Sequence, residues 1–293
     1  MGYDTSNEKI LRVNGVELAT ETFGNRNHPA ILLIQGAGNS MISWDAEFCR
    51  KFADEGRFII HYDSRDTGRS TSCEPGEPNY ALRDLKADTL ALIEAFELSK
   101  VHLFGQSQGA AITQLLAIEH PERIASITLG SGTPGGPGHG AADLPSMNEE
   151  IAQLFSGQTV VPEPDWNDRE SVANFLVEGE RPFAGGGHFD EEWMLETARH
   201  IYDRTLNLAS QLTNPFLLDA GSPWRDRLAE IAVPALIIHG TADPLFPFAH
   251  GEALAREIQN AKLLPLHEVG HAQLPRHVWD SVVKNIVEHT SLY

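Results

Sequence analysis

The first 133 residues alternate between short continuous apolar runs and longer segments whose apolar residues recur with a helical period. A short apolar run is typical of a strand buried on both faces of a parallel sheet, and the longer period is typical of an amphipathic helix. Strands are therefore predicted at residues 30–34, 58–62, 101–104 and 125–129, and helices near residues 43–55, 82–96 and 110–119. Before them, two β-rich segments at 9–13 and 16–23 flank Asn14-Gly15, a residue pair typical of a hairpin turn.

The alternation stops at Thr133–Gly138, a segment rich in proline and glycine that is followed by helical patterns without a buried-strand run. It resumes with strands predicted at 233–238 and 261–266 and helices near 248–258 and 278–290. Strands and helices that alternate in this way predict an α/β fold with a mostly parallel, doubly wound sheet. We expect residues 1–133 and 225–293 to form the core, and residues 134–224 to form a helical cap inserted after the sixth strand.

The charge balance and the cysteines limit the function classes. The 41 acidic residues outnumber the 22 lysines and arginines, and the formal net charge of −19 argues against nucleic acids, anionic membranes and polyanionic substrates. Cys49 and Cys73 lack the spacing of a disulfide framework or a metal site, and no apolar run reaches the ~18 residues of a membrane span. We therefore expect a cytoplasmic protein without a membrane partner. The sequence leaves a monomer and a homodimer open.

One motif stands between a predicted strand and a predicted helix. Gly105-Gln106-Ser107-Gln108-Gly109 matches G-x-S-x-G, and this context is that of a nucleophile elbow, in which the serine occupies a strained tight turn. Gly105 and Gly109 are expected to let strand and helix approach closely because they lack a Cβ. The unpaired N–H groups at the start of the helix favour negative charge near the Ser107 hydroxyl. Ser107 is therefore the candidate nucleophile.

Two further candidate catalytic residues follow the last two predicted strands. Asp243 comes after the strand at 233–238, and His271 comes after the strand at 261–266. Ligands of doubly wound sheets bind at the carboxyl ends of the strands, where Ser107 is also expected. A serine needs a neighbouring base to remove its proton, and an imidazole base needs a carboxylate to hold its tautomer. The sequence thus predicts a triad of Ser107, His271 and Asp243.

The turn Gln35–Asn39 follows the first parallel strand and carries two glycines. The backbone N–H groups of Ala37 and Gln108 are expected to form an oxyanion hole with two donors. A plain glycine-rich turn remains the alternative. A dinucleotide site is excluded because the third glycine is missing and no acidic residue stands about 20 positions further on.

Other charged and histidine-containing groups have less specific patterns. In the loop Asp63–Ser70, we expect Asp63 and Arg65 to brace the loop through charge-assisted hydrogen bonds, with an acid/base pair as the alternative. The spacing of His267 and His271 would suit metal ligands only on a helix, whereas here it runs from a strand into a loop. We therefore expect no metal.

The predicted cap offers aromatic side chains and glycines but no clear motif. Its aromatic residues are Phe155, Trp166, Phe175, Phe183, Phe189, Trp193, Tyr202, Phe216 and Trp224. Most are expected to hold the cap together and a few to line a pocket, but their spacing does not separate the two groups. The glycines at 185–187 follow no strand and have no lysine beside them, so we expect a lid loop instead of a phosphate site. We also expect hinge motion there and at Thr133–Gly138.

The chain resembles the α/β-hydrolase superfamily over essentially its whole length, because its nucleophile, acid and base follow that superfamily's chain order. The loop Asp63–Ser70 and the segment Gly105–Gln114 look like the aclacinomycin methylesterase group and its carboxylesterase relatives. The resemblance implies a capped serine esterase that needs no cofactor, with its triad and oxyanion hole at the positions named above. A methionine commonly follows the nucleophile in that group, whereas this chain has Gln108.

The implied activity is hydrolysis of a small-molecule carboxylic ester, with a methyl or other small-alcohol ester of a bulky apolar or aromatic acid as the candidate substrate. Other serine-triad chemistries of the same fold remain alternatives, namely cofactor-free perhydrolases or haloperoxidases, C–C hydrolases and lyases. A non-catalytic ligand receptor is also an alternative. Haloalkane dehalogenases and epoxide hydrolases are excluded because they use a carboxylate nucleophile where this chain has Ser107.

Overall fold

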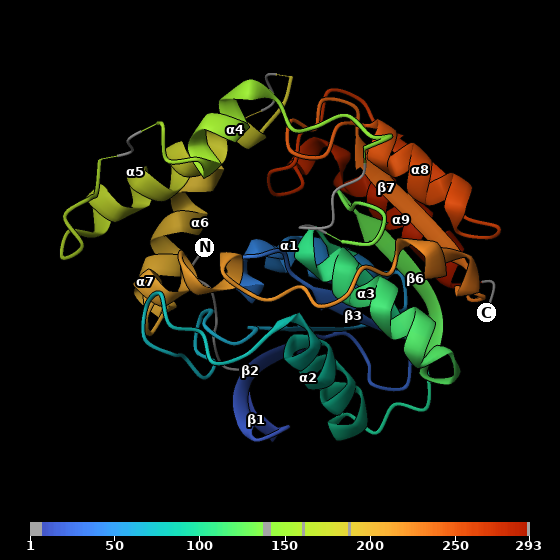
Figure 1. The fold of residues 1–293 in the computed structure, drawn as a ribbon. Helices are drawn as coiled ribbons and strands as arrows, with labels where there is room; N and C mark the ends of the chain where they lie inside the picture. The colour runs from blue at the N-terminus through green and yellow to red at the C-terminus, as the bar shows by residue number, and fades with distance from the viewer. Residues whose placement is uncertain (1–7, 137–141, 160–161, 187–188, 292–293) are drawn as a thin grey trace.

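The computed structural model describes residues 8–136, 142–159, 162–186 and 189–291, and these are built around one eight-stranded sheet (Figure 1). The strands are β1 (Lys9–Val13), β2 (Val16–Phe23), β3 (Ala30–Ile34), β4 (Phe58–Tyr62), β5 (Val101–Gln106), β6 (Ile124–Gly130), β7 (Ala235–Gly240) and β8 (Lys262–Leu266). Their order across the sheet is β1-β2-β4-β3-β5-β6-β7-β8. The β1–β2 and β2–β4 pairs are antiparallel and the remaining neighbours are parallel, which confirms the predicted sheet.

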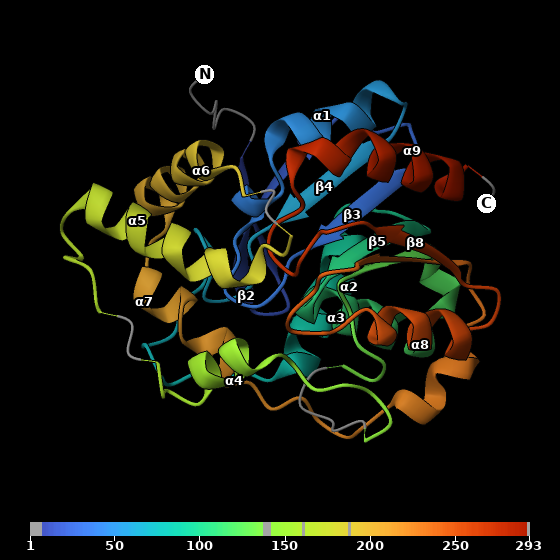
Figure 2. The ribbon, with the colours of Figure 1, turned by 90° about the horizontal axis from the view of Figure 1, so that it is seen from above.

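Helices cover both faces of this sheet. The helices are α1 (Ala46–Asp54), α2 (Leu82–Ala95), α3 (Gln108–Glu119), α4 (Glu149–Phe155), α5 (Arg169–Glu180), α6 (Glu191–Arg204), α7 (Leu208–Gln211), α8 (Ala249–Glu257) and α9 (Trp279–Thr290). Figure 2 shows α1 and α9 side by side on one face, with α2, α3 and α8 on the other. Strand β3 separates the two layers, because Ile31 and Leu33 belong to the α1–α9 core while Leu32 and Ile34 belong to the α2–α3 core.

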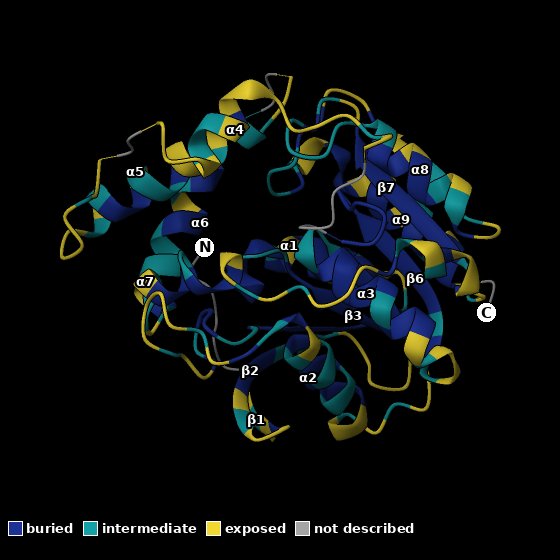
Figure 3. Ribbon diagram, in the orientation of Figure 1, coloured by how far each residue is buried: buried dark blue, intermediate teal, exposed yellow. Residues whose placement is uncertain are grey.

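Burial on both faces explains the continuous apolar runs of the central strands. Every residue of β3 and β4 is buried, and Figure 3 shows the central strands buried while α4 and the outer loops are largely exposed. Each fully buried leucine or isoleucine stabilises the folded state by roughly 1.5–3 kcal/mol. The periodicity of the sequence therefore determines the core, and with it the strand ends that carry the candidate site.

Helices α4 to α7 follow the sixth strand, β6, in the part of the chain where the strand–helix alternation stops. We propose that residues 134–224 form the cap and that residues 1–133 and 225–293 form the core. In the part of the chain that the structure describes, no helix is both long and apolar enough to cross a membrane.

The two glycine-rich segments that were predicted to be hinges make close contacts where the structure describes them. Gly135 donates a backbone hydrogen bond to the Gln114 side chain, and a Cβ on Gly136 would lie 2.3 Å from the Trp224 ring. In the second segment, Gly186 donates to the Glu268 carbonyl over 2.8 Å. Hinge motion in these two segments stays a prediction. Pro137, Gly138 and Gly187 lie outside the described residues.

Candidate active site

Ser107 stands between β5 and α3 in a backbone conformation that side chains rarely adopt, with φ 52° and ψ −114°. Its flanking glycines allow the close packing that this turn requires. A Cβ on Gly105 would lie 2.1 Å from the Gly109 carbonyl oxygen, and a Cβ on Gly109 would lie 2.1 Å from the carbonyl oxygen of Ile34 in β3. Strain of this kind persists only where the surrounding structure enforces it, and it is concentrated at functional sites.

The structure brings Ser107, His271 and Asp243 together. The His271 Nε2 atom lies 3.0 Å from Ser107 Oγ, and the His271 Nδ1 atom lies 2.8 Å from Asp243 Oδ2. The other Asp243 oxygen accepts hydrogen bonds from the backbone N–H groups of Leu245 and Phe246. Asp243 is buried and stays fully hydrogen-bonded, so its charge can orient the imidazole without moving.

A second histidine, His239, lies beside the same carboxylate, with its Nε2 atom 3.5 Å from Asp243 Oδ2. The His239 ring nitrogen also approaches the Phe246 carbonyl oxygen at 2.8 Å. Burial lowers the pKa of His239, so this ring is neutral near pH 7. Asp243 therefore faces a neutral His239 on one side and His271 on the other.

The loop that carries His271 is bound to the end of the α5 segment through backbone atoms. The Phe183 carbonyl accepts hydrogen bonds from the N–H groups of His271 (2.7 Å) and Ala272 (3.0 Å). A Cβ on Gly270 would lie 2.0 Å from that same carbonyl oxygen, so only glycine fits there. The rings of Phe183 and Phe246 lie 6.4 Å and 5.2 Å from the imidazole. These contacts fix the position of the histidine.

The turn after β3 lies against the serine. A Cβ on Gly36 would lie 3.2 Å from the Ser107 Cβ and 3.8 Å from the Ser107 Oγ. Ala37 follows it and lines the space next to the serine, while Gln108 is the first residue of α3. The Gln108 side chain does not extend freely into this space, since its Nε2 donates to the Pro215 carbonyl.

Asp63, at the start of the loop Asp63–Ser70, connects the segment after β3 to helix α6. It accepts hydrogen bonds from the backbone N–H groups of Met41 and Arg69, and Arg204 of α6 lies 2.6 Å from its Oδ2. Arg65 makes its charged contact elsewhere, with two hydrogen bonds of 2.7 and 2.8 Å to Asp88 of α2. The charge-assisted hydrogen bonds expected of the loop Asp63–Ser70 are present. They join this loop to α6 and α2, two helices that are distant from it in sequence.

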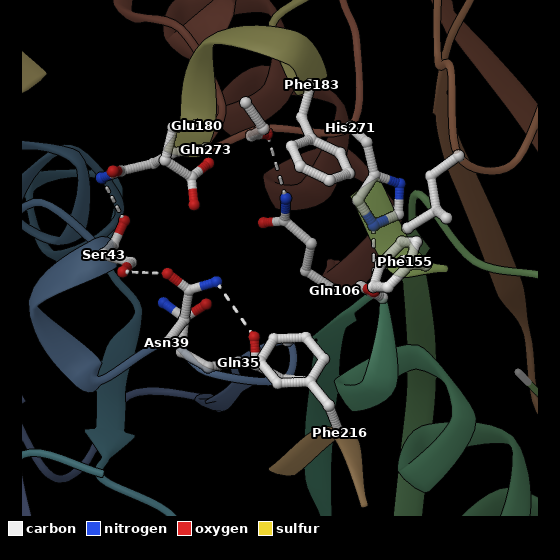
Figure 4. A pocket seen from close by; sticks show the side chains of 15 residues that line it. Gln35, Asn39, Ser43, Gln106, Phe155, Glu180, Phe183, Phe216, His271 and Gln273 are labelled. Atoms are coloured by element: carbon white, nitrogen blue, oxygen red, sulfur yellow. Dashed lines mark hydrogen bonds between the residues drawn. The ribbon is translucent and has the colours of Figure 1, made fainter. Parts of the chain in front are cut away.

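Two cavities meet at Ser107. The first, called here the polar cavity, has a volume of about 120 Å³ and is lined by Gln106, Glu180, His271 and Gln273, among others (Figure 4). The second, called the apolar cavity, has a volume of about 350 Å³ and is lined mainly by hydrophobic side chains, including Leu82, Met147, Leu218 and Phe246. Ala37, Ser107, Phe155, Phe216 and Leu245 line both.

The structure separates the aromatic residues of residues 134–224 by role. Phe155, Phe183 and Phe216 line the cavities, whereas Trp193 donates to Asp45 and packs against Trp279. Sequence reasoning missed Glu180, the last residue of α5, which lines the polar cavity. No motif marks it, because a glutamate on an amphipathic helix usually lies in solvent. Burial raises the pKa of this carboxyl group.

The described residues contain no group of three or more histidine, cysteine, aspartate or glutamate side chains that could hold a metal ion. The candidate site consists of a serine, a histidine and an aspartate that are joined by hydrogen bonds and lie below two cavities.

Comparison with known proteins places this geometry in a family. Residues 29–277 match the model of the alpha/beta hydrolase fold family. The chain belongs to this family. It is similar to the rhodomycin D methylesterase DnrP of Streptomyces peucetius, with 29% identity over 96% of this chain and 97% of the relative. It is also similar to the rhodomycin D methylesterase DauP of Streptomyces sp. (strain C5), with 28% identity over 96% and 97% of the two chains.

Solved structures give the same fold for this α/β-hydrolase. The enol-lactonase from Burkholderia xenovorans LB400 superimposes with a TM-score of 0.74 at 22% identity, covering 97% of this chain and 100% of the other.

Proposed function

We propose that this α/β-hydrolase cleaves carboxylic esters through an acyl-enzyme formed on Ser107. The observation that carries the proposal is the chain of two hydrogen bonds, 3.0 and 2.8 Å long, from Ser107 through His271 to Asp243. A serine held on a strained turn and bonded to an oriented imidazole has the geometry of an activated nucleophile. The similarity to two methylesterases supports an ester as the substrate.

The reaction follows from these contacts. His271 Nε2 takes the Ser107 proton while Oγ attacks the ester carbonyl, and Asp243 stabilises the imidazolium that forms. The imidazolium then protonates the leaving alcohol, so the alcohol departs and the acyl group stays on Ser107. Water, deprotonated by His271, attacks the acyl-enzyme and releases the acid. No step requires a cofactor.

The oxyanion hole in this proposal consists of the N–H groups of Ala37 and Gln108. The amide of Gln108 begins α3, where backbone N–H groups have no acceptor within the helix and the helix dipole favours negative charge. Ala37 follows Gly36, which lies against Ser107, and it lines the cavities at the serine, which supports its amide as the second donor to the same carbonyl oxygen. Loss of one such donor costs about 2.7–4 kcal/mol of transition-state stabilisation in comparable sites.

The two cavities support a placement for each half of the ester in this proposal. His271 lines the polar cavity and is not among the residues that line the apolar cavity, in the part of the chain that the structure describes. Since His271 must protonate the leaving alcohol, the alcohol belongs in the polar cavity and the acyl group in the apolar one. The cavity volumes of about 120 and 350 Å³ then favour a small alcohol and a bulky apolar or aromatic acid.

Hydrolysis of p-nitrophenyl acetate and of methyl 3-phenylpropanoate tests the proposal. We expect Ser107→Ala to lower kcat by at least about 10³-fold. Ser156→Ala, on an exposed surface position, is the matched control and should leave kcat unchanged. A fluorophosphonate should label the Ser107 peptide alone, as read by mass spectrometry. Binding of the esters without turnover would instead indicate a receptor, and a Ser107→Ala variant that kept more than a few per cent of kcat would contradict the assignment.

A further inference from the structure

Glu180 is an acidic side chain inside the candidate substrate pocket that the proposed ester hydrolysis does not use. It ends α5, and its carboxylate points into the polar cavity (Figure 4). Among the described residues, no hydrogen bond or ion pair is formed by this carboxylate, whereas its neighbours Glu178 and Arg181 pair with each other on the exposed side. The absence of a structural partner argues against a purely structural role for Glu180.

Among the described residues, no lysine or arginine lies in the cavity walls beside Glu180, which are those of the polar cavity and of the smaller space behind it. Glu180 is partly buried, and the loss of water around its carboxyl group raises the pKa of that group. The titratable group that acts on it in the opposite direction is His271, whose positive charge, when the ring is protonated, lowers the Glu180 pKa. A cation bound in the cavity would offset the loss of water around the carboxylate.

Two glutamines of the cavity, Gln106 and Gln273, have side-chain oxygens available to a ligand. Gln106 Nε2 donates to the Ala272 carbonyl, and Gln273 Nε2 donates to the Ser43 carbonyl. The side-chain oxygens of these two glutamines accept no hydrogen bond from the described residues, so they remain available as acceptors. The cavity therefore matches a group that carries positive charge and hydrogen-bond donors or polarised C–H groups.

Aromatic faces complete the same cavity. Phe155, Phe183 and Phe216 line it together with Glu180. An ammonium or alkylammonium group is attracted to the face of an aromatic ring as well as to a carboxylate. A neutral alkyl group would gain only the apolar contacts, and an anionic group would be repelled by Glu180.

We propose that the polar cavity is a cation subsite in which Glu180 binds the ammonium group of the leaving alcohol, so that the preferred substrates are esters of small amino or quaternary ammonium alcohols. This inference rests on the proposed ester hydrolysis and on the assignment of the alcohol to the His271 side of Ser107. It adds the charge of the alcohol, which the fold and the triad do not specify.

The experiment compares two esters of 3-phenylpropanoic acid that have nearly the same shape. One is the choline ester, with a fixed positive charge, and the other is the 3,3-dimethylbutyl ester, in which carbon replaces the nitrogen. We expect wild-type kcat/KM to be at least about tenfold higher for the choline ester, a difference of about 1.4 kcal/mol, because only its ammonium group is attracted to the Glu180 carboxylate and to the aromatic faces. Glu180→Gln should abolish this preference, so that the variant turns over the two esters with kcat/KM values within about twofold of each other.

Glu178→Gln is the matched control, since this glutamate lies two positions away on the exposed side of α5, and it should keep the wild-type preference. Calorimetric binding of the same two esters to Ser107→Ala gives the comparison without turnover. That readout separates the subsite from the proposed hydrolysis, because a cation preference in binding survives even if no ester is cleaved. Equal binding and turnover of the two esters by the wild type, or an unchanged preference in Glu180→Gln, would overturn the cation subsite.

Discussion

The substitution Gly109→Ala tests how closely the elbow must pack for the site to form. A Cβ at this position would lie 2.1 Å from the Ile34 carbonyl oxygen, 2.7 Å from the Ile34 carbonyl carbon and 2.8 Å from the Gln35 carbonyl oxygen. All three atoms belong to the backbone at the end of β3, so no side chain can rotate away. Ordinary van der Waals contact begins at 3.4 Å, so helix α3 and strand β3 would have to separate by about 1.3 Å (3.4 − 2.1 Å) or more.

That separation acts on stability and on chemistry together. Overpacking of a well-packed core typically costs about 1–3 kcal/mol, and here the backbone must absorb it. The displaced end of β3 leads into the turn that carries Ala37, and the displaced helix begins at Gln108, so the two proposed oxyanion donors move apart. Misplacement of a catalytic group by about 1 Å can lower the rate by about 10²-fold.

Urea unfolding and the hydrolysis of p-nitrophenyl acetate measure these two effects. The matched control is Gly179→Ala in α5, where a Cβ would meet nothing within 4 Å. In a helix interior, alanine is more favourable than glycine by about 0.5–1 kcal/mol, so the control should be as stable as wild type or slightly more stable. The reasoning fails if Gly109→Ala unfolds at the wild-type urea concentration and keeps kcat within a few-fold of wild type.

Two further predictions concern buried side chains that can carry a charge. Arg204→Met leaves the buried Asp63 carboxylate without its cation and should lower the free energy of unfolding by about 3–5 kcal/mol. The control Arg169→Met breaks an exposed ion pair and should lower it by about 1 kcal/mol or less. Urea unfolding of the two variants measures both changes. Burial lowers the pKa of His102 to about 4 in the folded protein. As the pH falls, the imidazole therefore takes up a proton at a higher pH in the unfolded chain than in the folded protein. The free energy of unfolding should therefore decrease by roughly 3 kcal/mol between about pH 6.5 and pH 4, and His102→Gln should remove that part of the decrease. An identical pH dependence in the variant would contradict the assignment.

The parts of the fold that sequence predicts are those determined by local pattern. The apolar run at residues 30–34 is buried throughout in β3 because both sheet faces are covered, and Asn14-Gly15 joins β1 to β2. The candidate triad could also be predicted, since parallel strands place their carboxyl ends at one edge of the sheet, and Ser107, Asp243 and His271 each follow a strand. Neither inference needs knowledge of long-range side-chain contacts.

The parts that sequence did not predict depend on contacts between distant segments. No local sequence pattern around Arg65 or Asp88 marks them as partners. They form an ion pair because α2 packs against the loop after β4. Glu180 has the same local context as its neighbour Glu178, yet it lines the polar cavity while Glu178 pairs with an arginine on the surface. One helical turn carries both, so the difference arises from what α5 packs against.

Gly185 and Gly186 show a requirement that glycine content alone does not reveal. They lie where the chain meets the His271 loop, and a Cβ on Gly185 would lie 2.5 Å from the Gly270 nitrogen. Backbone hydrogen bonds join residues 183–186 to residues 268–272, and each contributes about 0.5–1.5 kcal/mol. Opening the structure at this seam would break them and withdraw the support of His271. The glycines are thus needed for close approach, and the segment that forms one wall of the substrate cavity also positions the candidate base.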